Sequence, residues 1–154
     1  MTGLPLRRAS LADMPALARL HRHVRETCLP YLPDLHTPEE DLAFFQGHVF
    51  AACTIWLAEA EGRPVGFAAF RPDWLDHLYV DPAWHGRGVG RSLLAAALKE
   101  HPDLNLWTFQ RNEKARRFYE RRGFTLVALT DGSGNEEGEP DAHYLWVKGQ
   151  PPGT

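Results

Sequence analysis

The sequence predicts an α/β domain built on a mixed, mostly antiparallel central sheet of about six to seven strands flanked by about four helices. Three strand-like segments between Ile55 and Val80 are joined by short turns, as in an antiparallel meander. After Trp74, strand-like and helix-like segments alternate, which makes the later strands partly parallel. No repeat or linker divides the chain. Residues 1–149 are therefore expected to form one domain, followed by a loose tail at 150–154.

The first part of the chain predicts a short strand and two helices. Leu4–Arg8 is expected to be an edge strand. Ser10 and Asp13 form a capping-box pattern at a helix start. A second helix starts at Thr37–Glu40, with an N-cap, a proline in the first turn and acids near the positive end of the dipole. Apolar residues recur at helical spacing at Met14, Leu17, Leu20, Val24 and Cys28, then at Leu42, Phe45 and Val49.

The remaining elements follow from the change of hydrophobic period and from turn residues. A hairpin is expected around Glu61–Gly62, and Pro72–Asp73 precedes the next strand. The helix that ends near Arg122 has Gly123 at a plausible C′ position. The predicted strands are 55–60, 65–70, 74–80, 104–109, 124–129 and 143–148, and the later helices are 91–100 and 112–122.

Composition excludes several classes of protein. A net charge of -3 argues against bulk binding to nucleic acid. No apolar run is long enough for a signal peptide or a membrane span. Cys28 and Cys53 cannot form a disulfide framework, so reduced thiols in a cytoplasmic protein are expected. His21 and His23 lie on different faces of a helix, and no metal-ligand motif is present, so no metal is expected.

A glycine-rich loop between a strand and a helix carries the functional prediction. Gly86, Gly88 and Gly90 lack a Cβ atom, so their backbone N–H groups can approach an anion closely. The following helix adds unpaired N–H donors and a positive dipole end. Arg87 and Arg91 supply formal charge. The loop is therefore predicted to bind phosphate or pyrophosphate.

Two common phosphate motifs do not fit the spacing of this loop. A Walker A loop would need glycine and lysine where His85 and Arg91 stand. A Rossmann GxGxxG loop would need a final glycine where Arg91 or Leu93 stands. Both nucleotide-binding classes are excluded on these positions.

The stretch Leu78–Leu94 resembles the acetyl-CoA motif of the GNAT superfamily of N-acetyltransferases, Gln/Arg-x-x-Gly-x-Gly/Ala, together with its preceding strand and following helix. His85 departs from the motif, where the family usually has Gln or Arg, but the backbone cradle is unchanged. The stretch Asn112–Phe124 is similar to the family's later motif, N-x-x-A-x-x-F-Y-x-x-x-G-F. Two blocks in a matching order of elements make the resemblance specific between Trp74 and Phe124.

The resemblance implies acetyl-CoA as the acyl donor. The pantetheine arm would lie along the strand 78–80 like an added strand. The acetyl group would sit where the strand Trp74–Val80 splays from Leu104–Phe109. Asn112 would contact the cofactor or only cap its helix. The implied cofactor-binding residues are Leu78, Tyr79, Val80, His85, Gly86, Arg87, Gly88, Val89, Gly90, Arg91, Ser92 and Asn112.

The resemblance also implies direct attack of an amine on the thioester, with a backbone N–H near Leu78 stabilising the oxyanion. Tyr119 matches the family's general acid, since a phenol of pKa about 10 can protonate a thiolate of pKa about 8.5. Its alternative role is a core aromatic. Asp76 and His77 are the candidate bases, and strand alternation places them on opposite faces. Both could instead be structural, with proton transfer through water.

By the same resemblance, the acceptor side is formed by the segment Leu29–Cys53 and the acidic loop Asp131–Ala142. The loop would attract a cationic amine if it faces the cleft, and is otherwise a solvated hairpin loop. Tyr31, His36 and Trp74 either shape the pocket or fill the core.

The sequence thus predicts a cytoplasmic N-acetyltransferase that moves an acetyl group from acetyl-CoA to a primary amine. The alternative is a non-catalytic acyl-CoA-binding sensor or interaction module. The acceptor is expected to be a small-molecule amine or a protein or peptide amine, with neither nucleic acid nor a membrane as partner. The resemblance allows a homodimer. Nothing in the sequence selects one acceptor.

Overall fold

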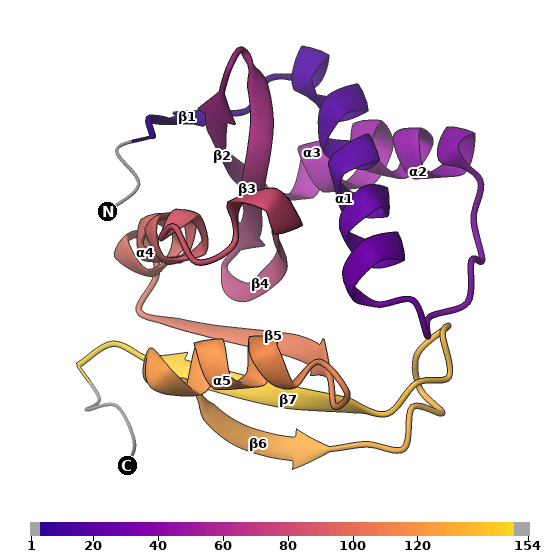
Figure 1. Cartoon of the computed structure of the whole chain (residues 1–154). Coiled ribbons are helices and arrows are strands. Elements are labelled where there is room, and N and C mark those ends of the chain that lie inside the picture. The colour runs from indigo at the N-terminus through magenta and orange to yellow at the C-terminus, as the bar shows by residue number, and fades with distance from the viewer. Residues whose placement is uncertain (1–3, 150–154) are drawn as a thin grey trace.

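A computed structural model describes residues 4–149 (Figure 1). Its strands form one seven-stranded sheet in the order β1-β2-β3-β4-β5-β7-β6. The expected tail at 150–154 lies outside the described residues. The strands are β1 (Leu6–Arg8), β2 (Thr54–Ala60), β3 (Arg63–Arg71), β4 (Asp73–Val80), β5 (Asp103–Phe109), β6 (Thr125–Leu129) and β7 (Asp141–Val147). The helices are α1 (Met14–Cys28), α2 (Pro38–Phe44), α3 (Phe50–Ala52), α4 (Val89–Glu100) and α5 (Glu113–Arg121).

The sheet opens between β4 and β5, its one parallel pair among the described strands. These two strands are paired only at Asp73 with Leu104 and at Trp74 with Asn105. Every other neighbouring pair is antiparallel, including β5 with β7 over seven residue pairs. The predicted mixed sheet and the predicted splay are both confirmed. The gap between the two halves of the sheet is visible in Figure 1.

Helices cover both faces of the sheet and create two cores. On one face, α1 and the segment after α2 bury Met14, Leu17, Phe45 and Val49 against β2 and β3. On the other face, α4 and α5 pack over a core that spans both halves of the sheet. Successive residues of β4 therefore point to different cores, and Tyr79 contacts the α1 side whereas Leu78 and Val80 contact the α4 side.

Local signals in the sequence explain where most elements begin and end. Thr37 caps α2, and Glu40 completes the predicted capping box. Glu61 and Gly62 both have positive φ in the β2–β3 turn, as a type I′ hairpin requires. Gly123 has φ +94 after α5.

The structure adds two irregularities to the predicted helices. A 3₁₀ turn, Leu11–Asp13, precedes α1, so the α-helix itself starts later than the capping box at Ser10 suggests. A π-helical turn, Phe45–Val49, joins α2 to α3 and keeps Phe45 and Val49 on the buried side. Within residues 4–149, no helix combines the length and apolar character that crossing a membrane requires.

Candidate functional site

The glycine loop lies directly between the end of β4 and the start of α4. Gly86 has φ +77 and Gly88 has φ +82, a backbone region that L side chains rarely adopt. A Cβ atom at Gly86 would meet nothing within 4 Å, so this side of the loop faces open space. Helix geometry leaves the first N–H groups of α4, from Val89 onward, without an intrahelical acceptor. The loop therefore presents backbone donors to an anion.

Gly90 has a different role from the other two glycines. A Cβ atom there would lie 3.5 Å from the Phe118 ring and 3.7 Å from a methyl group of Val80. These are ordinary van der Waals distances, so a Cβ atom would be accommodated where the first turn of α4 packs against α5 and the end of β4. Ser92 donates its backbone N–H to Gly88 O at 3.0 Å, which closes the first helical turn.

Three cations surround the loop, and none has a carboxylate partner among the described residues. Arg87 and Arg91 are exposed, and the Arg87 guanidinium lies over the Trp84 ring at 4.7 Å. Lys114, from α5, donates to His85 Nδ1 at 2.9 Å. These charges are available to an anionic ligand at the loop.

His85 is the residue that departs from the family motif, and its ring links three elements. Its Nε2 lies 2.8 Å from Val80 O, and its Nδ1 lies 2.9 Å from Lys114 Nζ. The ammonium can only donate, so Nδ1 accepts and Nε2–H donates to the carbonyl. His85 therefore holds Lys114 at the loop, while it occupies one carbonyl at the end of β4.

Beyond Trp74, one edge of β4 is not paired with β5. On its other edge, Leu78, Tyr79 and Val80 pair with Ala68, Phe67 and Gly66 of β3. The unpaired edge leads directly into the glycine loop. An extended ligand could hydrogen-bond there as an added strand.

The Tyr119 side chain projects from α5 into the core beside Phe118 and Phe124. The residue is 8% exposed, and burial strongly raises the pKa of its phenol. The nearby Tyr79 hydroxyl acts in the same direction. No described residue hydrogen-bonds the Tyr119 hydroxyl, so it is free to donate to a ligand.

A β-bulge determines how the two candidate bases are placed. Leu75 pairs with Phe70 and His77 with Ala69, so Asp76 is the extra residue. The Asp76 carboxylate accepts from Arg71 Nε at 2.7 Å and from Arg71 Nη2 at 3.2 Å. Asp76 does not line the pocket described next, whereas His77 does.

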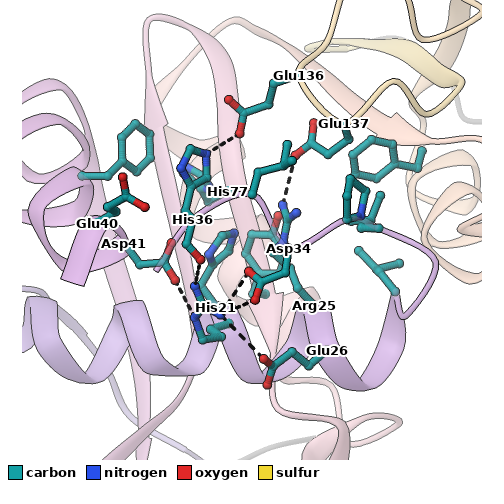
Figure 2. A pocket seen from close by; sticks show the side chains of 18 of the residues that line it. His21, Arg25, Glu26, Asp34, His36, Glu40, Asp41, His77, Glu136 and Glu137 are labelled. Atoms are coloured by element: carbon teal, nitrogen blue, oxygen red, sulfur yellow. Dashed lines mark hydrogen bonds and ion pairs between the residues drawn. The ribbon is translucent and has the colours of Figure 1, made fainter. Parts of the chain in front are cut away.

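A pocket of about 720 Å³ lies on the α1 side of the open sheet edge (Figure 2). Its walls come from α1, the segment 29–36, α2 and the turn after it. His77 and Tyr79 of β4 and Trp107 and Phe109 of β5 also line it. Glu136 and Glu137 bring the acidic β6–β7 loop to the pocket. The segments expected on the acceptor side thus line this pocket in part, together with α1.

The pocket carries an excess of acidic side chains. Arg22 and Arg25 are its two arginines, and six carboxylates line it. Both arginines are neutralised, since Arg22 Nε lies 2.7 Å from Asp41 and Arg25 Nη1 lies 3.3 Å from Glu137. The six acidic residues are Glu26, Asp34, Glu40, Asp41, Glu136 and Glu137.

Two loops from distant parts of the chain meet over this pocket. His36 Nε2 and Glu136 Oε1 are 2.6 Å apart, and this hydrogen bond raises the pKa of the His36 imidazole (Figure 2). Arg22 of α1 donates from Nη2 to His36 O at 2.5 Å, so the segment 29–36 is held against α1. Of the other two aromatic candidates, Tyr31 lies under the Arg111 guanidinium at 4.6 Å, and Trp74 stacks on His143. Neither lines the pocket.

His21 is a pocket residue that the sequence analysis considered only as a possible metal ligand. Its ring makes edge-on contacts with the rings of His77 and Tyr79, which also line the pocket. A signal was present, because His21 lies four residues after Leu17 and three before Val24, on the buried stripe of α1. A histidine at an apolar position of an amphipathic helix is a candidate for a buried site.

Asn112 caps α5 by accepting from Ala115 N at 3.2 Å. Its side-chain oxygen is therefore already used within the protein. Within residues 4–149, no group of three or more His, Cys, Asp or Glu side chains could hold a metal ion.

Comparisons with a family model and with curated proteins point to the same family. The family model described as an acetyltransferase (GNAT) domain matches residues 51–126. "Probable N-acetyltransferase Rv2775" of Mycobacterium tuberculosis is 32% identical over 146 residues, covering 84% of each chain. Peptidyl-lysine N-acetyltransferase YjaB of Escherichia coli is 36% identical over 78 residues, covering 50% of this chain and 53% of YjaB.

Solved structures agree with this result. The solution structure of apo YjaB from Escherichia coli superposes with a TM-score of 0.76 at 25% identity, covering 94% of this chain and 97% of YjaB. The yncA protein of Salmonella typhimurium, solved with acetyl-CoA, shares the fold with a TM-score of 0.74 at 20% identity, covering 97% and 96%. The open sheet edge, the glycine loop and these similarities together lead to one conclusion: the chain belongs to the GNAT family of N-acetyltransferases.

Proposed function

We propose that this acetyltransferase takes its acetyl group from acetyl-CoA and transfers it to a cationic primary amine. The observation that carries the donor assignment is the unpaired edge of β4 leading into the glycine loop. The backbone donors of the loop suit a pyrophosphate, as do Arg87, Arg91 and Lys114, which have no carboxylate partner among the described residues. The free edge of residues 78–80 suits the amide groups of a pantetheine arm. When bound, acetyl-CoA supplies an activated thioester.

The roles of the chain's own residues follow from their positions. Tyr119 is proposed as the acid that protonates the departing thiolate, because its hydroxyl is buried and has no partner among the described residues. A backbone N–H near Leu78, at the open edge of β4, is proposed to stabilise the oxyanion. Of the two residues considered as bases, only His77 lines the pocket, so it is proposed to contact the amine there, whereas Asp76 is paired with Arg71 outside the pocket. Asn112 is proposed to position α5 through its cap.

The acceptor assignment rests on the charge of the pocket. The six carboxylates of the pocket outnumber its two arginines, and this excess of negative charge attracts a positively charged amine. YjaB is named a peptidyl-lysine acetyltransferase, and a lysine side chain is such an amine. The proposed acceptor class is therefore an alkyl amine with a second positive charge nearby, on a small molecule or a peptide.

Calorimetry with acetyl-CoA tests the donor, with NAD and ATP as controls. Selective binding at micromolar concentrations or below is expected. Thiol release with 1,5-diaminopentane, compared with the neutral-tailed pentylamine, then tests the acceptor class. Equal binding of ATP would contradict the donor assignment, and equal turnover of the two amines would contradict the second positive charge.

We also propose that two copies pair through β6. This strand forms the edge of the sheet, and it pairs with β7 on one side only. It contains no charged residue, and Val127 and Leu129 are each 53% exposed. Such an edge favours pairing with another strand. Sedimentation should show a homodimer that Val127→Lys converts to a monomer, and an unchanged mass would contradict the contact.

A cytoplasmic location is proposed from the two cysteines. Cys28 and Cys53 are both free, and burial raises the pKa of the Cys53 thiol to about 12. Free thiols are typical of reducing compartments. Cell fractionation of the tagged protein tests this location.

A further inference from the structure

Two histidines at the floor of the acceptor pocket have no role in holding the fold together by hydrogen bonds. His21 comes from α1 and His77 from β4, and their ring centroids are 5.6 Å apart in an edge-on arrangement. Both side chains line the pocket (Figure 2). Neither ring forms a hydrogen bond with any residue in the range 4–149, and both Nδ1 atoms are buried without a partner. Buried polar atoms without partners are rare in folded proteins, and each calls for an explanation such as a water, an ion or a functional role.

The surroundings of the two rings are aromatic. His21 lies 4.7 Å from the Tyr79 ring and 5.5 Å from the Phe45 ring, measured between centroids. His77 lies 5.9 Å from Phe45 and 6.4 Å from Phe44. No carboxylate oxygen of a described residue comes within 4 Å of either ring's nitrogens. The floor of the pocket, formed by His21 and His77, therefore differs from its acidic rim, which consists of Glu26, Asp34, Glu40, Asp41, Glu136 and Glu137.

The charged groups that act on the two rings come from several elements. Arg22 and Arg25 of α1 disfavour a positive charge on His21. For His77, Arg25 and His48 act in the same direction, and Asp76 opposes them. Burial is the largest influence in both cases, and it lowers the pKa of His21 to about 3 and that of His77 to about 4. Both rings are therefore neutral at physiological pH.

We propose that His21 and His77 together bind the nitrogen of the acceptor amine in its neutral form, with His21 a specific amine-binding residue. This inference rests on the proposed function, since it concerns the acceptor of the same site. Each neutral imidazole offers one lone pair and one N–H group. A neutral primary amine can donate one N–H to the lone pair of each ring, so the two rings can hold it in a single orientation while its own lone pair stays free for attack.

The division between rim and floor explains how a cationic amine becomes reactive. An alkyl ammonium group has a pKa near 10.4, and it has no lone pair for attack. The acidic rim favours the ammonium form in solution, whereas a buried neutral floor disfavours a charge. The ammonium proton passes to solvent as the nitrogen moves from rim to floor. His21 and His77 then hold the neutral nitrogen without changing their own protonation state.

Nitrogen NMR of the histidine rings tests binding without turnover. The protein bound to CoA, which cannot donate an acetyl group, is titrated with 1,5-diaminopentane. The ring resonances of His21 and His77 are expected to shift when the amine binds. Because the pKa values of the two rings are about 3 and about 4, the resonances should be those of neutral imidazole between pH 5 and 8. His23, on the same helix but 56% exposed in its side chain and outside the pocket, is the internal control. Rings that stay unshifted at saturating amine would overturn the proposal, as would a ring that titrates above pH 6.

Kinetics with matched variants tests the role of His21 in catalysis. His21→Phe keeps an aromatic ring but removes the hydrogen bonds, so KM for the amine is expected to rise about tenfold. kcat and KM for acetyl-CoA should change much less. His21→Gln, which retains a donor and an acceptor, should recover part of the loss, and His23→Phe should match the wild type. An unchanged amine KM in His21→Phe, in a protein that still binds acetyl-CoA, would overturn the proposal for His21.

The pH profile separates neutral binding from base catalysis by a titrating imidazole. For the wild type, kcat/KM for the amine is expected to rise about tenfold per pH unit from pH 7 to 9, because the neutral amine fraction does so. An inflection between pH 6 and 7 that His77→Phe removes would overturn neutral binding. Failure of the proposed function has a different signature, since the protein would then bind no acetyl-CoA in calorimetry, whatever the histidine rings do.

Discussion

The donor side and the acceptor side of this enzyme are built in different ways. The proposed donor side is one continuous stretch, 78–92, in which backbone N–H groups and an open strand edge are proposed to do most of the binding. The acceptor side is assembled from α1, the segment 29–36, β4, β5 and the β6–β7 loop, and side chains define it. A site made of backbone in one segment is fixed by local geometry. A site made of side chains from several elements depends on how those elements pack.

The two sides also carry opposite charge. At the glycine loop, Arg87, Arg91 and Lys114 have no carboxylate partner among the described residues. At the acceptor pocket, the two arginines are paired and carboxylates are in excess. This separation directs an anionic cofactor and a cationic amine to different ends of the same open sheet edge.

The largest expected effect is on the donor side. Gly88→Asp places a side chain at φ +82 and a carboxylate beside the proposed pyrophosphate site. Acetyl-CoA affinity should fall by more than about 100-fold in calorimetry, since both strain and charge repulsion oppose binding. Gly149→Asp is the matched control, because Gly149 has φ +86 and open space around it in the turn after β7. Retained affinity in Gly88→Asp would remove the loop from the donor site.

The second-largest expected effect is on kcat, at Tyr119, which lies between the proposed donor and acceptor sides. Tyr119→Phe removes the proposed acid, so kcat should fall about 100-fold while acetyl-CoA affinity stays within about twofold. Tyr144→Phe is the control, because the Tyr144 hydroxyl is buried in the same core but already bonds Arg116 and Glu120. It should lower the melting temperature rather than kcat. Wild-type turnover in Tyr119→Phe would leave Tyr119 as a core aromatic.

Acid stability tests the neutral floor of the acceptor side. The pKa values of about 3 for His21 and about 4 for His77 lie below the ordinary imidazole value. Below about pH 6.5, the unfolded chain therefore binds protons that the folded chain does not, and the free energy of unfolding falls as pH decreases. Each ring contributes a slope of up to about 1.4 kcal/mol per pH unit between pH 6 and 4.

Urea unfolding at a series of pH values measures this slope. His21→Phe should reduce this slope by the contribution of one ring. If the slopes of His21→Phe and the wild type coincide, the buried neutral imidazole is contradicted.

The smallest expected effect concerns the rim. Glu137→Gln removes one carboxylate and releases Arg25 from its ion pair, so the rim becomes less negative by a full charge. KM for 1,5-diaminopentane should rise about fivefold at low salt, and the difference should shrink as salt screens the interaction. Glu61→Gln in the β2–β3 turn removes the same charge outside the pocket and should have no effect. A salt-independent change would indicate lost packing instead of lost attraction.

Much of the fold could be predicted because its signals are local. The capping box of Thr37 and Glu40, the positive-φ turn at Glu61–Gly62 and the glycine after α5 each act within a few residues. The glycine loop is equally local, so its residues could be assigned from spacing and resemblance. The π-helical turn at Phe45–Val49 was not predicted, because the burial of Phe45 and Val49 against the sheet selects it over a continued α-helix.

The sequence by itself determined the order of the elements and the family of this protein, and it located the glycine loop that is proposed to bind the donor. Each of these depends on neighbouring residues or on a continuous motif. The tertiary structure alone decided which residues of β4 line the pocket, because the bulge at Asp76 breaks the alternation that would otherwise assign them. It also brought His21 to His77, which are 56 positions apart in the chain, and Glu137 to Arg25. Contacts between side chains of distant segments exist only after packing, and no local pattern records them.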